Sequence, residues 1–102
     1  MFNAHKGLFV FIDTHCHLNI MVKETFDIPL QDADFAVAAK IIADASAHQV
    51  NILIQVGTSL IESENCIKLA KRFANNYAVI GIHPNDITSS WKQELKRLHA
   101  LA

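Results

Sequence analysis

Two histidines, separated by one residue, close an apolar stretch near the start of the chain, in Asp13-Thr14-His15-Cys16-His17. In an extended strand, side chains two positions apart point to the same face, so His15 and His17 project together while Cys16 points the other way. Two imidazoles on one face can bind a single metal ion. The spacing therefore predicts a metal-binding pair, with two structural histidines as the alternative. Cys16 is expected in the core.

A third histidine, His83, closes another apolar stretch in Gly81-Ile82-His83-Pro84. The carboxyl ends of parallel strands meet at one edge of a sheet, which is where barrel enzymes build their active sites. We therefore expect His83 at the same level as the first pair and in a functional role. Asp13 is placed to accept a hydrogen bond from the ring of a metal-bound histidine, on the side of the ring away from the metal. Alternatively, it accepts a hydrogen bond from the backbone at the strand end.

Apolar runs alternate with helical patterns along the rest of the chain. In order, the expected elements are Leu8–Asp13, Asp34–His48, Asn51–Val56, Leu60–Asn75, Tyr77–Ile82 and a last helix after Ser90. Short continuous apolar runs are typical of strands buried on both faces of a parallel sheet. Strands that alternate with helices predict right-handed crossovers and an α/β fold. Residues 18–33 are expected to form a long loop beside the site.

The helix over Leu60–Asn75 has the clearest start signal. Ser59 and Glu62 have the spacing of a capping box, in which the hydroxyl and the carboxylate each satisfy a free backbone N–H. Further along, Cys66, Ala70 and Phe73 fall on one helical stripe. We expect this stripe to pack against the sheet.

Composition limits the possible classes of protein. The 102 residues are 51% hydrophobic and 19% charged, with a formal net charge of -1, which suits one small globular domain. A chain without a basic surplus is a poor candidate for non-specific nucleic-acid binding. Its two cysteines make no disulfide framework, and its longest apolar run is far shorter than the roughly twenty residues that span a membrane. We expect a cytoplasmic protein with no membrane contact.

Three segments, Phe11–Leu18, Val56-Gly57-Thr58 and Gly81–Pro84, occur in an order and spacing typical of one family. Together they resemble the opening of the TatD family of metal-dependent deoxyribonucleases, within the amidohydrolase-like hydrolases. The resemblance extends from Leu8 to Leu101 and leaves residues 1–7 as a short N-terminal extension. It implies a TIM-type barrel with a divalent-metal site at its C-terminal face.

The resemblance also implies roles for individual residues. His15 and His17 match the first two metal ligands of the family, and His83 matches a histidine near the substrate phosphate. The complete family site holds two divalent ions, for which Zn, Mg and Mn are candidates, and DNA is the substrate. Two positions depart from the family pattern: Gln49 replaces a helix-ending glycine, and Asn19 replaces a common aspartate.

The chain holds about three of the eight βα units of such a barrel. Residues 1–102 are therefore expected to be an N-terminal fragment of one hydrolase barrel, inactive alone because the family's later carboxylate and histidine ligands are absent. One alternative is a non-catalytic remnant or half of a split protein, which pairs with itself or a complementary chain through exposed sheet edges. Another is a related hydrolase of amide or ester bonds.

Overall fold

Three parallel strands alternate with helices in the computed structural model, which describes residues 10–102. The elements are β1 (Phe11–Cys16), α1 (Leu18–Met21), α2 (Asp32–Ala47), β2 (Val50–Val56), α3 (Leu60–Arg72), β3 (Asn76–Val79), the 3-10 turn η2 (Pro84–Asp86) and α4 (Trp91–Leu101). The sheet order is β1-β2-β3, and both strand pairs are parallel. This confirms the predicted α/β class, with successive βα units arranged as in the first part of a TIM-type barrel.

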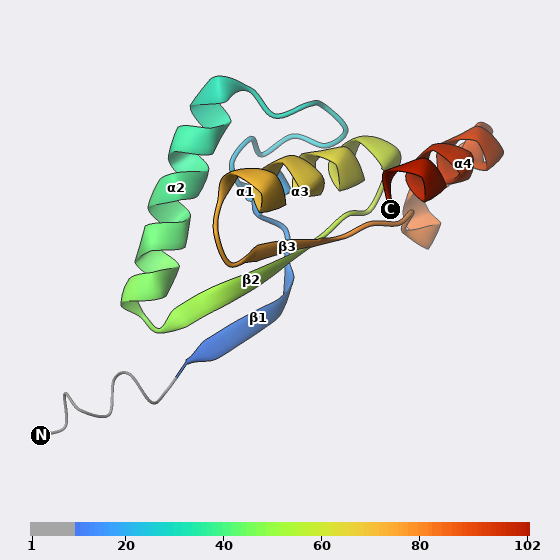
Figure 1. Cartoon of the computed structure of the whole chain (residues 1–102). Coiled ribbons are helices and arrows are strands. Elements are labelled where there is room, and N and C mark those ends of the chain that lie inside the picture. The colour runs from blue at the N-terminus through green and yellow to red at the C-terminus, as the bar shows by residue number, and fades with distance from the viewer. Residues whose placement is uncertain (1–9) are drawn as a thin grey trace, which may run out of the picture.

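Helices α2 and α3 lie on the same side of the sheet (Figure 1). The hydrophobic core lies on this side, between the two helices, the short helix α1 and the segment that leads into α2. Its fully or almost fully buried members are Leu18, Leu30, Phe35, Ala38 and Leu69. The helices therefore cover one face of the sheet and leave the other open.

The strand register shows which residues face each side. Leu53 and Gln55 are buried toward the helices, and the intervening Ile54 pairs with Tyr77 on the opposite face. Val56 pairs with Val79 on that same open face. Tyr77 and Val79 are 56% and 50% exposed, so the open face is apolar but in contact with solvent.

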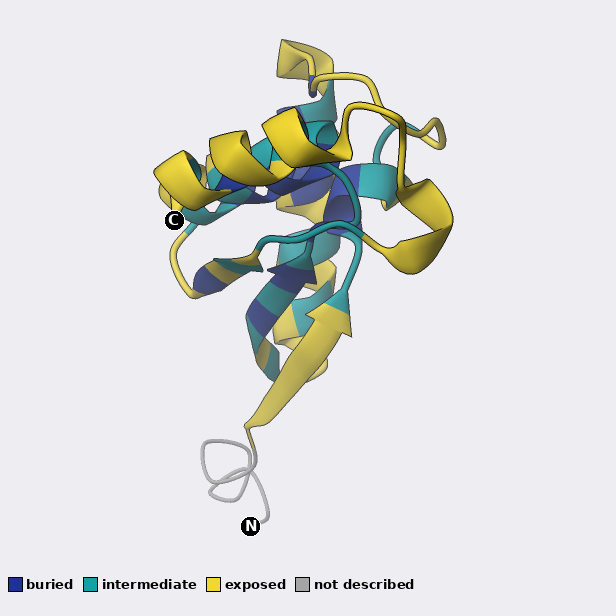
Figure 2. Cartoon of the chain, turned by 90° about the vertical axis from the view of Figure 1, so that its right-hand side faces the viewer, coloured by how far each residue is buried: buried dark blue, intermediate teal, exposed yellow. Residues whose placement is uncertain are grey.

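Strand β1 is not buried on both faces, and that prediction is wrong. Phe11 and Ile12 are 57% and 53% exposed, and β1 is coloured as exposed along most of its length in Figure 2. The physical reason is that α2 and α3 pack mainly against β2 and β3 and do not cover β1. Strands β2 and β3 are themselves covered on one face only, because Tyr77 and Val79 are half exposed on the other. The predicted strand residues Leu8 and Phe9 and the N-terminal extension 1–7 lie outside the described residues.

The third strand is shorter than predicted, because it ends at Val79 instead of Ile82. The Ser63 hydroxyl on α3 donates to the Gly81 carbonyl and accepts from the Gly81 N–H, each at 3.1 Å. The backbone polar groups of Gly81 are therefore satisfied by a helix side chain and not by a neighbouring strand. His83 follows three residues of extended chain that are not part of the sheet ladder.

Residues 18–33 are not one continuous loop, because the chain forms α1 directly after His17. The His17 carbonyl accepts the first bonds of this turn, from the N–H groups of Ile20 and Met21 at 3.0 Å. The remainder of the segment turns sharply, with Glu24 and Asp27 at positive φ values of 53° and 56°. The short helix escaped prediction because four residues are too few to show a helical period.

Helix α4 begins after Ser90, as predicted. Leu98 is buried, whereas Trp91 and Leu95 are about half exposed and line an apolar groove with Ile82 and Ile87. Within residues 10–102, none of the helices has the length and apolar character needed to cross a membrane.

Candidate functional site

His15 and His17 lie together at the carboxyl end of β1, as the strand period predicted. Their ring centroids are 5.0 Å apart, and the ring planes meet at 81°. Cys16 packs on the opposite side against the hydrophobic core, where burial and the nearby Asp13 carboxylate raise the pKa of its thiol. Cys16 is therefore kept as a neutral core residue, and the two imidazoles share the side that faces the cavity.

The His17 ring is fixed by one hydrogen bond to β2. Its Nδ1 lies 2.9 Å from the Val56 carbonyl oxygen, which can only accept, so Nδ1 carries the proton and donates it. In the neutral ring the lone pair is then on Nε2, which is the arrangement found when a histidine binds a metal and its other nitrogen donates to a backbone carbonyl. The tertiary structure thus prepares Nε2 of His17 for a ligand.

The His83 ring has the opposite polarity. Its Nδ1 accepts a hydrogen bond from the Asn85 N–H at 3.0 Å, so in the neutral ring the proton is on Nε2. Its backbone N–H donates to the Thr58 carbonyl at 2.8 Å, which ties the segment after β3 to the end of β2. His83 therefore presents an N–H donor and is not prepared to give a lone pair to a metal.

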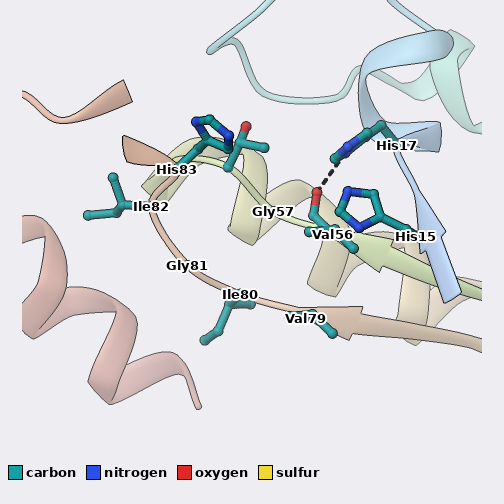
Figure 3. Close-up of a pocket in the computed structure, with 10 residues that line it drawn as sticks. His15, His17, Val56, Gly57, Val79, Ile80, Gly81, Ile82 and His83 are labelled. Atoms are coloured by element: carbon teal, nitrogen blue, oxygen red, sulfur yellow. Dashed lines mark hydrogen bonds between the residues drawn. The ribbon is translucent and has the colours of Figure 1, made fainter. Parts of the chain in front are cut away.

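All three histidines line a single cavity of about 360 Å³ at the carboxyl ends of the strands. Figure 3 shows His15 and His17 on one side of this cavity and His83 on the other. The other lining residues are Val56, Gly57, Thr58, Val79, Ile80, Gly81 and Ile82. The structure therefore brings the predicted site residues from two strand ends to one place.

Asp13 lies on β1, two residues before His15. Its Oδ1 accepts a hydrogen bond from the backbone N–H of His15 at 3.1 Å. Asp13 bonds the backbone and not a histidine ring, but it does so inside the strand, because β1 continues to Cys16 and does not end at Asp13 as predicted. Asp13 thus fixes the backbone that carries the His15 ring.

Gly57 holds the floor of the cavity against α3. A Cβ atom at Gly57 would lie 2.4 Å from Ser63 Oγ and 2.7 Å from Ser63 Cα, so any side chain there forces α3 away. Ser63 in turn holds Gly81, on the segment that leads to His83. The close approach of β2 and α3 therefore sets the position of the His83 side of the cavity.

Glu62, next to Ser63 on α3, is completely buried and accepts four hydrogen bonds. The donors are Asn19 and Asn65 to Oε1, both at 3.0 Å, and Lys23 at 2.6 Å and the Asp27 N–H at 2.8 Å to Oε2. Its carboxylate does not return to the N-terminus of its own helix, so the predicted capping box is only half formed. Ser59 still caps α3 by accepting from the Glu62 N–H at 3.2 Å.

Comparison with protein families gives a match over most of the chain. The model of the TatD-related DNase family matches residues 12–102, which include all three cavity histidines. The chain belongs to the TatD-related DNase family. Its α/β units and its cavity at the carboxyl ends of the strands are those expected of this family.

Curated TatD proteins are similar to part of the chain. It is 41% identical over 64 residues to the "3'-5' ssDNA/RNA exonuclease TatD" of Cronobacter turicensis, a match that covers 62% of this chain and 24% of the relative. It is 38% identical over 63 residues to the protein of that name from Enterobacter lignolyticus, covering 61% and 24%. The chain therefore spans about a quarter of the length of the TatD relatives that it matches.

The two histidines suit part of a TatD metal shell. His17 offers an Nε2 lone pair, and His15 lies beside it on the same wall of the cavity. Catalytic zinc sites use three protein ligands, and residues 10–102 contain no group of three or more histidine, cysteine or acidic residues placed to hold one ion. Within this part of the chain, His15 and His17 are therefore a pair of candidate ligands.

Sequence reasoning missed the burial of two polar residues of α3. Glu62 and Ser63 lie four and three positions before Cys66, so they continue the predicted buried stripe of α3 toward its N-terminus. A polar side chain on a buried stripe needs hydrogen-bond partners. The signal available in the sequence was therefore the presence of two polar residues at positions expected to be buried.

Proposed function

We propose that this chain is the metal-binding N-terminal part of a TatD-type nuclease, which hydrolyses phosphodiester bonds in DNA. The observation that carries the proposal is the His15–His17 pair on the cavity wall, with the His17 lone pair directed away from its bond to Val56. The names of the curated relatives extend the substrate to single-stranded DNA and RNA. The protein is expected to act in the cytoplasm, where its two cysteines remain reduced.

In this proposal each cavity residue has one role. His15 and His17 hold a divalent metal ion, with Zn, Mg and Mn as candidates, and Asp13 fixes the backbone of His15 by accepting from its N–H. When bound, the ion supplies positive charge that stabilises the phosphate during hydrolysis. His83 donates its Nε2–H to a phosphate oxygen from the other side of the cavity.

The chain alone is expected to bind metal weakly and to leave DNA intact. Two imidazoles leave most of the coordination sphere of a metal to water. A second metal ion of the family site would need carboxylates, and residues 10–102 contain no group of three or more histidine, cysteine or acidic side chains placed to hold an ion. Activity therefore requires further ligands, from a longer TatD chain or from a partner chain.

A role through chain pairing is the second candidate. It is favoured by the open face of the sheet, where Tyr77 and Val79 are half exposed. A strand edge next to such a face is a template for pairing with another chain. In that case the histidine cavity becomes complete only in the assembly.

The test separates metal ligands from a substrate contact. We expect His15→Ala and His17→Ala each to lower the zinc affinity of the chain more than tenfold, measured by competition with a chromophoric chelator. His83→Ala and His48→Ala should bind zinc as the unchanged chain does, since His48 is exposed on the C-terminus of α2. Equal affinity in all four variants contradicts the assignment of the pair.

The catalytic role of His83 is tested after fusion of this segment to the remaining residues of a TatD relative. His83→Ala should lower the rate of cleavage of single-stranded DNA by about 10²–10³, the usual cost of losing one donor to a developing charge. Excess metal should partly restore the His15 and His17 variants and leave His83→Ala unchanged. Recovery of His83→Ala by metal would make His83 a ligand instead.

A further inference from the structure

We infer that Glu62 is a positioning residue for His17, and that it acts through helix α1. The inference that Glu62 fixes the His17 ring stands on contacts alone. It rests on the proposed function only for the purpose of this restraint, which is to direct Nε2 of His17 toward a metal ion. The contacts that carry it join Asn19 in α1 and Lys23, which follows α1, to Glu62 on α3.

Helix α1 is a single turn whose first residue follows His17. Such a turn has too few internal hydrogen bonds to stay helical without tertiary contacts. Because His17 is its N-cap, any movement of α1 moves the His17 backbone and changes the direction of the ring. The bond from Nδ1 to the Val56 carbonyl, at 2.9 Å, depends on that direction.

Glu62 holds α1 at two points. Its Oε1 accepts from the Asn19 side chain inside the turn, and its Oε2 accepts from Lys23 just after it. Lys23 also donates to the Thr25 carbonyl at 2.5 Å, so the same ammonium group holds the turn that follows α1. One carboxylate therefore clamps both ends of the turn to α3.

The contacts of Glu62 with Lys23 and Asn19 include an ion pair and are shielded from solvent. The side chains of Lys23 and Glu62 are 3% and 1% exposed, and Asn19 is fully buried. An ion pair held in such surroundings has strict geometry, because neither charge can be left without its partner. Glu62 therefore restricts α1 more tightly than an apolar contact would.

Asn19 transmits the restraint. Its Nδ2 donates to Glu62, whereas its Oδ1 is buried without a hydrogen-bond partner in the described part of the chain. An unpaired buried carbonyl has a cost and contributes no stability. Asn19 is thus held in place for its single bond to Glu62, which connects the carboxylate to the residue two positions after His17.

The experiment reads the His17 ring directly. Ring ¹⁵N chemical shifts, recorded without metal at a pH where the imidazoles are neutral, report which nitrogen carries the proton. In the unchanged chain we expect one tautomer at His17, with the proton on Nδ1, and the other at His83. Glu62→Gln should give a mixture of tautomers at His17 and leave His83 unchanged.

Glu64→Gln is the matched control, because Glu64 lies on the same helix and takes no part in the hydrogen bonds of Glu62. It should leave both rings as they are. A general loosening of the fold would mix the tautomers at His17 and His83 together, so selective mixing at His17 distinguishes positioning from lost stability.

Asn19→Ala tests the inference if Glu62→Gln does not fold. It keeps the Lys23–Glu62 pair and the other donors to Glu62, and it removes the unpaired carbonyl together with the bond. It should also mix the tautomers at His17 only. A single Nδ1–H tautomer at His17 in Asn19→Ala, or in a folded Glu62→Gln, overturns the inference.

Zinc titration of the same variants separates this inference from the proposed function. If the unchanged chain binds zinc, Glu62→Gln and Asn19→Ala should each weaken binding about tenfold, as outer partners of metal-bound histidines do, and Glu64→Gln should not. If the unchanged chain binds no zinc, the proposed function fails, while the ¹⁵N shifts still decide whether Glu62 positions His17.

Discussion

Glu62 is an acidic residue in completely buried surroundings. Burial alone would raise the pKa of its carboxyl group, but hydrogen bonds from Lys23, Asn65, Asn19 and the Asp27 backbone outweigh burial and lower it. The carboxylate is thus charged at neutral pH although it is inaccessible to water. Its energetic role is to neutralise Lys23 and to connect α3 with α1, through Asn19, and with the segment after α1, through Lys23 and the Asp27 N–H.

The lowered pKa of Glu62 predicts a pH dependence of stability. A carboxyl group with a lower pKa in the folded state contributes stability above its ordinary pKa, and this contribution is lost as the pH falls through the folded value. At neutral pH, Glu62→Gln should lower the free energy of unfolding by about 3 kcal/mol, because Lys23 remains buried without a counter-charge. Urea denaturation at several pH values should show this difference narrowing toward acid pH.

Glu64→Gln again serves as the control. Its unfolding free energy should run parallel to that of the unchanged chain across the same pH range. A Glu62→Gln difference that stays constant down to acid pH would mean that the charge on Glu62 contributes nothing.

At the scale of elements, the contact between the end of β2 and α3 depends on the absence of a side chain at Gly57. Neither Gly57 nor Gly81 has a positive φ, so backbone conformation alone requires glycine at neither position. A Cβ at Gly57 would collide with the backbone of Ser63, whereas a Cβ at Gly81 meets nothing within 4 Å. The two glycines of the cavity therefore differ only in how closely another element approaches.

This difference predicts opposite results from the same substitution. Gly57→Ala should destabilise the chain by at least 2 kcal/mol, because overpacking against a backbone atom requires α3 to shift. Gly81→Ala should stay within about 0.5 kcal/mol. Thermal unfolding followed by circular dichroism checks both, and equal effects would show that β2 and α3 are not in close contact in solution.

At the scale of the whole molecule, one face of the sheet is covered and the other is open. The open face carries Ile52, Ile54 and Val56 on β2, flanked by Ile12 and by Tyr77 and Val79 on the two edge strands. Exposed apolar surface beside unpaired strand edges favours association with another chain. The same face is the one that a barrel would enclose.

We therefore expect the purified chain to associate as its concentration rises. Val79→Lys should reduce this association, because a lysine on the open face of an edge strand opposes pairing. Val37→Lys is the matched control, since Val37 is exposed to a similar extent, 43% against 50%, but lies on α2. Light scattering after size exclusion at several concentrations measures the mass.

A mass that stays monomeric at every concentration would contradict this expectation. Equal loss of association in both lysine variants would mean that the added positive charge, and not its place on the open face, opposes association.

Local patterns predicted much of the fold and of the site. The starts of α3 and α4, directly after Ser59 and Ser90, are confirmed, and the Ser59 side chain caps α3 as predicted. Gln49 adopts the left-handed conformation, with φ of 69°, at the helix end where the family usually has glycine. The alternation of His15, Cys16 and His17 was also correct, since the strand period depends only on neighbouring residues.

The sequence by itself therefore determined the order of elements, the parallel sheet and the pairing of His15 with His17, because each follows from periods of two or 3.6 residues and from short motifs. Only the tertiary structure decided the exposure of β1, the end of β3 at Val79 and the protonated nitrogens of His17 and His83. These depend on contacts between residues distant in sequence, such as the 39 positions between His17 and Val56. A period along one segment carries no information about which distant atom accepts its hydrogen bond.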